Sequence, residues 1–276
     1  MPFLGKNAEG AKQLEVDLID VHSVSIERSI CIGQHEVPLD SVSTNKTSYR
    51  EVSAVIGMRI NTPPAAVPQR LVAALGAIPT AILSDNMGRL ASGGAGLRPW
   101  HGAARLMGRA LTVRTRPGDN LLVHKAVETA QPGDVLAIDA GGDLTNAIIG
   151  EILMRLAAKR GVVGFAVDGA IRDLGAFTAA DFPVFARGVT HRGPYKDGPG
   201  ELNVPVRIGE MVVHPGDILV GDEDGLVAVP RTEASEILSA AQQQVEREAA
   251  ILRSIKDGTV DRSWVDATLR EKGYDL

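Results

Sequence analysis

A cluster of charged side chains follows the apolar run GVVGFAV. The stretch VDGAIRD (167–173) delivers Asp168, Arg172 and Asp173 in quick succession. An arginine guanidinium binds a carboxylate or an enolate through a fork of N–H donors, and an aspartate offers the hard oxygen that Mg²⁺ or Mn²⁺ prefers. The cluster is therefore a candidate site for an anionic ligand beside a divalent metal. The same residues also fit a helix cap with a surface ion pair, with Asp168 forming a turn before Gly169.

A second candidate junction is IDAGGDLTNAIIGEIL (138–153). Glu151 lies there, 21 positions before Arg172, within or just before the first turns of a predicted helix. In open α/β folds, ligands gather where strands hand over to helices, because backbone N–H groups are unpaired there and the helix dipole favours anions. We therefore expect the two junctions to belong to neighbouring βα units.

Other catalytic patterns find little support in the sequence. The six histidines are isolated and Cys31 is the only cysteine, which excludes an intrachain disulfide and a cysteine metal cage. No Walker-type phosphate loop and no GxSxG elbow occurs, and AGGD (140–143) does not match GxGxxG. Lys125 has the chemistry for a Schiff base, but its place in an amphipathic helix favours a solvated lysine.

Composition predicts a globular protein with a substantial core. The chain has 276 residues, of which 44% are hydrophobic and 23% charged. Its net charge of −5 argues against a dedicated nucleic-acid binder. No apolar run approaches the length of a membrane span, and the N-terminus lacks the apolar stretch of a signal peptide. With a single cysteine, a cytoplasmic setting is the simplest expectation.

The elements that must position the two junctions follow an α/β pattern that starts near Met58. An N-terminal extension of uncertain structure (1–57) precedes it. Short β segments follow residue 200, separated by Gly- and Asp-containing turns. Periodicity predicts strands at 110–115, 135–140, 161–167 and 182–188. It predicts helices at 68–76, 120–130, 146–160 and 174–180. A further helix is predicted within 79–91, capped by Ser84 or Asp85.

Pro-Gly-Asp occurs at 117–119, 132–134 and 215–217, where proline and glycine suit the centre of a type II turn. The C-terminal stretch predicts a helix that Thr232 caps and Gly258 ends. Its narrow apolar stripe predicts packing on the body of the protein or on a neighbouring subunit.

Several segments together resemble the RraA-like family, which includes the 4-hydroxy-4-methyl-2-oxoglutarate/4-carboxy-4-hydroxy-2-oxoadipate aldolases. The likeness runs from about Pro79 to the C-terminal helix. It is carried by RPGDNLLVHKAVETAQPGDVLAIDAGG (116–142), GEIL (150–153), GFAVDGAIRD (164–173), FPVFARG (182–188) and LNVPVRIGEMVVHPGDILVGDEDGLVAVPR (202–231).

The resemblance implies an α/β fold of three β/β/α layers, of the swivelling, phosphohistidine-domain-like kind, with a C-terminal helix. An RraA-like aldolase domain would then span 58–276. The resemblance also implies a homotrimer or a hexamer with active sites between subunits. The aldolase members resemble class II enzymes, in which Mg²⁺ or Mn²⁺ holds the pyruvate half of a 2-oxo acid substrate.

Carried over by position, Asp173 matches the metal ligand and Arg172 the residue that contacts the keto or enolate oxygen. Gly150, Glu151, Ile152 and Leu153 match the stretch whose backbone amides receive the substrate carboxylate. The aldolase pattern has aspartate where this chain has Glu151. Glutamate keeps the charge and reaches one methylene further, so it can still orient a catalytic water, but the change leaves the exact reaction open.

The implied activity is cleavage of a 4-hydroxy-2-oxo acid to pyruvate, with oxaloacetate decarboxylation as a side activity. Two alternatives stay open: a non-catalytic RraA-type regulator that binds and inhibits ribonuclease E, and another metal-dependent 2-oxo-acid lyase or hydratase. Residues across a subunit interface would set substrate length, and the acidic Glu246/Glu248 region of the C-terminal helix is one candidate, against the simpler interpretation of a solvated face.

Overall fold

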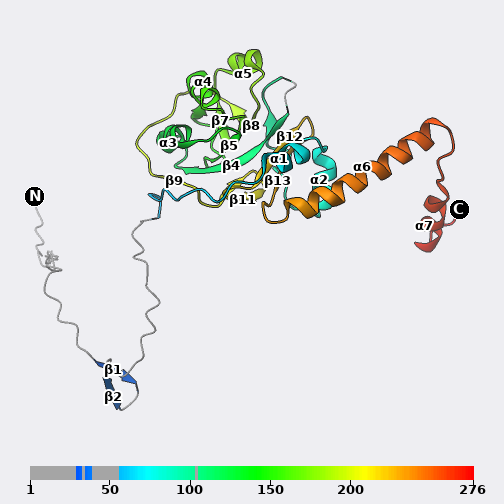
Figure 1. The fold of residues 1–276 in the computed structure, drawn as a ribbon, viewed down its shortest axis with the longest axis horizontal. Helices are drawn as coiled ribbons and strands as arrows, with labels where there is room; N and C mark the ends of the chain where they lie inside the picture. The colour runs from blue at the N-terminus through cyan, green and yellow to red at the C-terminus, as the bar shows by residue number, and fades with distance from the viewer. Residues whose placement is uncertain (1–28, 33–34, 39–55, 103–104) are drawn as a thin grey trace, which may run out of the picture. The chain divides into compact units, whose positions relative to one another are not determined.

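The computed structural model describes residues 29–32, 35–38, 56–102 and 105–276. The chain divides into two units, Met1–Val52 and Ser53–Leu276. In the first unit, β1 (Ser29–Ile32) and β2 (His35–Pro38) pair as an antiparallel hairpin (Figure 1). The sequence left the structure of the N-terminal extension open, and most of the extension lies outside the described residues.

Four parallel strands form the centre of the second unit. They are β4 (Leu106–Thr115), β5 (Asp134–Asp139), β7 (Gly164–Ile171) and β8 (Val184–Val189). Each strand is joined to the next through a crossover helix: α3 (Leu121–Thr129), α4 (Glu151–Lys159) and α5 (Leu174–Ala180). The three helices lie together on one side of the sheet, as the green segments of Figure 1 show. A crossover helix is the usual link between parallel strands.

Antiparallel strands extend the sheet to the order β13-β12-β4-β5-β7-β8-β3, with β6 beside β7 and β9 beside β4. The antiparallel strands are β3 (Arg98–Pro99), β9 (Gly200–Leu202), β12 (Ile218–Asp222) and β13 (Gly225–Val229), whereas β6 (Ala147–Ile149) is parallel to β7. A separate hairpin consists of β10 (Val206–Ile208) and β11 (Met211–Val213).

Alternating side chains of the central strands serve two cores. In β5, Leu136 and Ile138 belong to the core under α3, α4 and α5, whereas Val135 and Ala137 belong to the core shared with β10 and β11. This is the two-residue period of a sheet that is buried on both faces. The helices, the central sheet and the second β layer confirm the predicted β/β/α arrangement.

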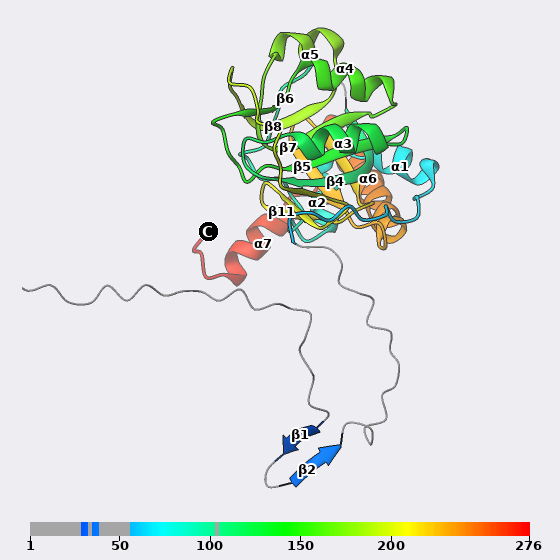
Figure 2. The same cartoon turned by 90° about the vertical axis from the view of Figure 1, so that its left-hand side faces the viewer.

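A third core lies between the β12–β13 end of the sheet and three helices. They are α1 (Gln69–Gly76), α2 (Thr80–Asn86) and the first turns of α6 (Ala234–Lys256), and a short helix α7 (Ser263–Glu271) follows. Figure 2 shows α2 and α6 away from α4 and α5. No helix in the described part of the chain is both long and apolar enough to cross a membrane.

Two predicted elements near the candidate site have different bounds. The first residues of the predicted helix 146–160 form β6, because the apolar Ala147–Ile149 pairs with β7 and is buried. The predicted strand 161–167 instead runs through Gly164–Ile171 as β7. Asp168 is therefore not a turn residue: it is buried inside the strand and forms an ion pair with Arg187, which compensates its charge.

The turn and cap predictions had mixed outcomes. The glycines of the three Pro-Gly-Asp turns have φ of 75°, 88° and 85°, as the third residue of a type II turn requires. Ser84 and Asp85 lie inside α2 and cap nothing; Pro79 precedes the helix. Glu233 rather than Thr232 flanks the start of α6, and α7 was not predicted.

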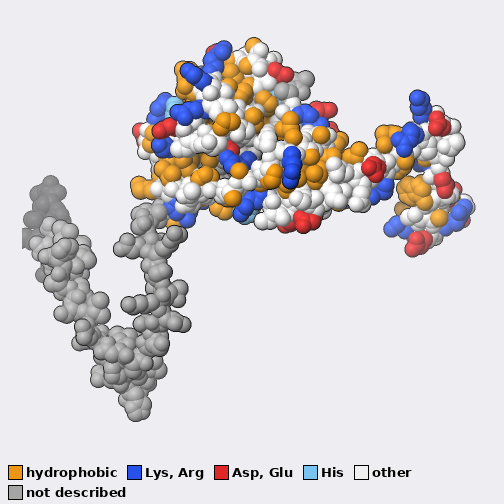
Figure 3. Space-filling view, viewed as in Figure 1, with side chains coloured by type: hydrophobic (Ala, Val, Ile, Leu, Met, Phe, Trp, Pro, Cys, Tyr) orange, Lys and Arg blue, Asp and Glu red, His pale blue; other side chains and the backbone are white. Residues whose placement is uncertain are grey.

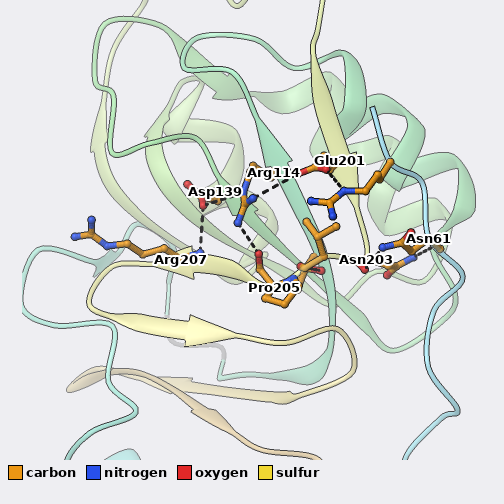
Figure 4. Close-up of polar contacts among 10 residues, drawn as sticks. Asn61, Arg114, Asp139, Glu201, Asn203, Pro205 and Arg207 are labelled. Carbon is orange, nitrogen blue, oxygen red and sulfur yellow. Dashed lines mark hydrogen bonds and ion pairs between the residues drawn. The ribbon is translucent and has the colours of Figure 1, made fainter. Parts of the chain in front are cut away.

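Residues 57–61 run along β9 and close that side of the sheet. The Gly200 amide donates to the Gly57 carbonyl over 2.8 Å and the Leu202 amide to the Arg59 carbonyl over 2.9 Å. Beside them, the Glu201 carboxylate is only 1% exposed and pairs with Arg59 and with Arg114 of β4 (Figure 4). The hydrogen bond from Arg59 lowers the pKa of Glu201 against the opposing effect of burial, and the Gly57 amide and Arg114 add to this.

Candidate active site

The two predicted junctions meet because β6 and β7 are parallel neighbours, so their carboxyl ends lie at one edge of the sheet. The Arg172 amide donates to the Ile149 carbonyl over 3.0 Å. The Asp173 carboxylate accepts the Glu151 amide over 3.0 Å. Helix α4 therefore begins directly against Arg172 and Asp173, and the sequence-predicted residues form one site.

The start of α4 provides amide donors for an anion. The first bond within the helix runs from the Met154 amide to the Gly150 carbonyl over 3.0 Å. The Glu151 amide is taken by Asp173. The amides of Ile152 and Leu153 are then the helix-start donors that lack an intrahelical acceptor. A substrate carboxylate placed there would also meet the positive end of the helix dipole.

Gly150 is required for space rather than for backbone conformation. Its φ of −152° and ψ of −167° are extended and open to any residue. A Cβ atom at this position would collide with the Asp173 carboxylate and would lie 2.9 Å from Cγ of Arg172. The absent side chain is what allows Arg172 and Asp173 to approach the start of α4 so closely.

Asp173 has an unusual backbone. It adopts the left-handed conformation, with φ 57° and ψ 40°, immediately before α5, a region that few residues other than Gly, Asn and Asp visit. Its side chain is 42% exposed, and its Oδ2 lies 3.7 Å from Nε of Arg172. The carboxylate therefore keeps access to solvent and to a ligand while its position is fixed by the Glu151 amide.

The Glu151 carboxylate is directed elsewhere. It forms an ion pair with Arg155, one turn later on α4, over 2.7 Å. No contact within the described part of the chain joins this carboxylate to Arg172 or Asp173; the backbone of Glu151 makes that connection instead. The i, i+4 spacing of Glu151 and Arg155 is a signal that sequence reasoning missed.

A cavity of about 100 Å³ adjoins Arg172 and contains residues that sequence reasoning missed. Its lining includes Gly150, Arg172 and Asn120, together with His124 of α3 and Lys196 from the loop that precedes β9. Burial lowers the pKa of His124, and the positive charge of Lys196 lowers it further, so the imidazole is neutral at pH 7. The segment NLLVH (120–124) brings Asn120 and His124 to one side of α3, a helical spacing that could have suggested a shared role.

Asp119 fixes the loop that carries Lys196. Its buried carboxylate accepts the amides of Leu121, Asp197 and Gly198 over 2.9, 2.7 and 3.0 Å. Burial acts to raise the pKa of Asp119, but these three amides and Arg116 outweigh it, and the pKa lies below its usual value. The loop around Lys196 is therefore held against the start of α3.

The remaining candidates lie apart from the site. Lys125 pairs with Glu128 on α3 over 3.1 Å, which agrees with a solvated helix lysine. Glu246 and Glu248 lie on α6, where Glu248 accepts a hydrogen bond from Gln244 over 2.8 Å. Among the described residues, no group of three or more His, Cys, Asp or Glu side chains could hold a metal. A single carboxylate such as that of Asp173 fits the way Mg²⁺ binds many proteins, in which one carboxylate is a ligand and substrate and water supply the other oxygens.

The fold and the site together define an α/β protein with an anion-binding helix start beside an arginine and an aspartate. A family model described as RraA-like, Aldolase/RraA, matches residues 80–228, more than half of the chain. The chain belongs to the RraA-like family, as the resemblance had predicted.

Three similar proteins illustrate the range of the family. A Halalkalibacterium halodurans protein named "Putative 4-hydroxy-4-methyl-2-oxoglutarate aldolase" is 40% identical over 183 residues, covering 66% of this chain and 87% of the relative. A Thermus thermophilus protein named 4-hydroxy-4-methyl-2-oxoglutarate aldolase is 40% identical over 129 residues, 47% of this chain and 78% of the relative. The solved structure of Streptomyces coelicolor RraAS2, described as an unusual member of the RNase ES inhibitor RraA protein family, is 28% identical with a TM-score of 0.63, covering 68% and 98%.

Proposed function

We propose that this protein is a divalent-metal-dependent class II aldolase that cleaves a 4-hydroxy-2-oxo acid of the 4-hydroxy-4-methyl-2-oxoglutarate type to pyruvate. The observation that carries the proposal is the convergence of Arg172, Asp173 and the start of α4 at one point. The names of the aldolase relatives support the same reaction class. Oxaloacetate decarboxylation is proposed as a second activity because it passes through the same pyruvate enolate.

In the proposed complex, the C1 carboxylate of the substrate accepts the free amides of Ile152 and Leu153 at the start of α4. The guanidinium of Arg172 donates to the C2 keto oxygen. Asp173 would hold Mg²⁺ or Mn²⁺, which would supply Lewis-acid polarisation of the keto group when bound. The exposed carboxylate of Asp173 fits this role, since its position is already fixed by the Glu151 amide.

Cleavage begins when a water that Glu151 orients takes the proton of the C4 hydroxyl. The C4–O bond becomes a carbonyl, the C3–C4 bond breaks, and its electron pair forms the enolate of pyruvate. Arg172 stabilises the negative charge that develops on the C2 oxygen. The same water returns this proton to C3, which gives pyruvate. Glu151 reaches this water only when its carboxylate turns from Arg155, a surface ion pair that costs little to break.

The test is direct. Purified protein with Mg²⁺ or Mn²⁺ should form pyruvate from 4-hydroxy-4-methyl-2-oxoglutarate and from oxaloacetate. The pyruvate is measured by its reduction with lactate dehydrogenase and NADH. Chelation should abolish the activity and added metal should restore it. Absence of pyruvate from both substrates would refute the aldolase.

A second candidate function is favoured by the similarity to the Streptomyces coelicolor protein of the ribonuclease inhibitor family. In that case the chain would bind ribonuclease E stoichiometrically and inhibit it without metal-dependent turnover.

A third candidate is another metal-dependent lyase or hydratase. It would consume a 2-oxo acid and release a hydrated or dehydrated product in place of pyruvate.

We also propose that the protein assembles as a homotrimer or hexamer in the cytoplasm. Leu121, Ile152 and Leu156 are exposed on α3 and α4 beside the site, and Figure 3 shows hydrophobic and basic side chains intermixed over these helices. Exposed apolar side chains grouped in this way are typical of protein interfaces. Analytical ultracentrifugation would determine the assembly, and a monomer would contradict the proposal.

A further inference from the structure

The guanidinium of Arg172 is placed by neighbouring backbone rather than by polar partners. Within the described residues it donates no hydrogen bond, and its one ion pair is the contact of 3.7 Å between Nε and Oδ2 of Asp173. That distance exceeds hydrogen-bond length. A long side chain without such bonds keeps much of its rotamer freedom. The aim of Arg172 toward a substrate therefore depends on the atoms packed around it.

Two glycines come close to this guanidinium, one at each end. A Cβ atom at Gly150 would lie 3.0 Å from Nε of Arg172, and a Cβ atom at Gly193 would lie 3.1 Å from its Nη1. Ordinary van der Waals contact begins near 3.4 Å. Both backbone segments therefore approach Arg172 this closely only because neither residue has a side chain.

Gly193 is required for space and not for its backbone conformation. Its φ lies outside the positive range that residues with a side chain avoid. Pro194 follows it, and the residue before a proline favours the extended conformation, which other residues also adopt. The room that glycine leaves beside Arg172 is then the physical reason for its presence, as it is at Gly150.

Asn146 holds the Gly193 backbone in place. Its Nδ2 donates to the Gly193 carbonyl over 2.5 Å, and the neighbouring Ala147 amide donates to the Arg192 carbonyl over 2.9 Å. Asn146 comes directly before β6, the strand that leads into α4. The short segment 146–150 therefore holds one of the two glycines through Asn146 and contains the other.

Both ends of this connection are themselves fixed. Asn146 packs on the turn at 117–119, where a Cβ atom at Gly118 would lie 3.3 Å from its own Cβ. The Thr190 amide donates to the Ile171 carbonyl over 3.0 Å, so the loop that carries Gly193 begins beside the site. Geometry that is fixed before the substrate binds is what a catalytic side chain needs from its surroundings.

We propose that Gly193 and Asn146 are positioning residues that aim the Arg172 guanidinium at the keto oxygen of the substrate. Gly193 leaves room for the guanidinium, and Asn146 keeps the Gly193 backbone against it. The inference rests on the proposed function and adds two residues that act through Arg172. Because negative charge on the keto oxygen grows only as the enolate forms, a misplaced guanidinium lowers kcat more than it raises KM.

The first test adds a side chain at residue 193. Gly193→Ala requires Nη1 of Arg172 to move by about 0.3 Å to reach ordinary contact. Since misplacement by about 1 Å costs about 100-fold in rate, kcat for pyruvate formation should fall about 3- to 10-fold, and about 30-fold in the bulkier Gly193→Val. The KM should change less than about 2-fold. The matched control is Gly175→Ala, where a Cβ atom meets nothing within 4 Å.

The second test removes the hydrogen bond that holds Gly193. Asn146→Ala should lower kcat about 3- to 10-fold because the loop can then move away from Arg172. Thr145→Ala is the matched control, since the Thr145 hydroxyl donates to Asp143 over 2.8 Å and not to the loop. Full activity in Asn146→Ala would overturn the role of Asn146.

A double-mutant cycle distinguishes positioning from general damage to the fold. Arg172→Lys removes the guanidinium and keeps a positive charge. If Gly193 acts through the guanidinium, adding Gly193→Ala to Arg172→Lys should change kcat less than about 2-fold. The same loss of kcat in both backgrounds would overturn the proposal.

The same cycle can be measured without turnover. Oxalate resembles the enolate of pyruvate, and calorimetry with Mn²⁺ present gives its dissociation constant. Gly193→Ala and Asn146→Ala should each weaken oxalate binding about 3-fold or more, and Gly193→Ala should have no further effect in Arg172→Lys. Partial unfolding lowers the number of binding sites and leaves the dissociation constant of the folded fraction unchanged. Unchanged dissociation constants in both single variants would contradict the proposal.

The outcomes separate the inference from the function on which it rests. A wild-type protein that forms no pyruvate and binds no oxalate would refute the aldolase itself. An active wild-type enzyme whose Gly193→Ala and Arg172→Lys effects simply add would refute only the positioning role.

Discussion

Replacing Gly150 by alanine tests how closely the site is packed. The new Cβ would lie 2.9 Å from Cγ of Arg172 and would collide with the Asp173 carboxylate. Ordinary van der Waals contact begins near 3.4 Å, so Arg172 must retreat by about half an ångström and Asp173 must shift with it. Misplacement of catalytic groups by about 1 Å costs about 100-fold in rate. We expect kcat for pyruvate formation to fall about 30- to 100-fold, which is about 2–3 kcal/mol of activation free energy.

The assay is metal-dependent pyruvate formation, measured with thermal unfolding of the same samples. The extended backbone of Gly150 suits alanine, so the melting temperature should change little. The matched control is Gly175→Ala in α5, where a Cβ would meet nothing within 4 Å. Full activity in Gly150→Ala would show that Arg172 and Asp173 do not act from the positions described here.

Further predictions concern charge and stability. Asp173→Asn keeps a residue type that tolerates the left-handed backbone, so the melting temperature should stay within about 2 °C while pyruvate formation falls at least about 100-fold. Because the pKa of Asp119 is lowered from 3.8, its hydrogen bonds stabilise the folded state above pH 3.8. This stability is lost as the pH falls through the pKa of Asp119 in the folded state. Asp119→Asn should therefore lower the free energy of unfolding by about 1–3 kcal/mol at pH 7, and urea titrations should find a smaller difference near pH 3. Glu201→Gln should also cost about 1–3 kcal/mol by leaving Arg59 and Arg114 without their partner; an unchanged urea midpoint would contradict this.

Much of the fold was predictable because its strands are short apolar runs between turn signals. The parallel strands and their crossover helices follow from that alternation, and the three Pro-Gly-Asp turns were identified from local chemistry alone. Asp168 was misassigned because its burial depends on Arg187, which lies on the next strand. Such tertiary pairing leaves no local signal.

The site was predictable in part for a similar reason. The chemistry and spacing of Arg172, Asp173 and the start of α4 are visible along the chain and made them candidates, and the family resemblance supplied the roles predicted for them. Asn120 and Lys196 were missed because the cavity joins two segments that are distant in sequence and that meet only in the folded chain. The Glu151–Arg155 ion pair, by contrast, has the i, i+4 spacing of a helix, which the sequence does show.

The position of β4 inside the sheet has a consequence for how the chain folds. One edge of β4 pairs with β5, which follows it closely, but its other edge pairs with β12 and β9 from much later in the chain. During synthesis that second edge stays open until β9 and then β12 have left the ribosome. An open apolar strand edge invites pairing with other chains, and non-local pairing of this kind slows folding. Yield in a recombinant host should therefore rise at low temperature or with added chaperones, and chains cut before β12 should aggregate.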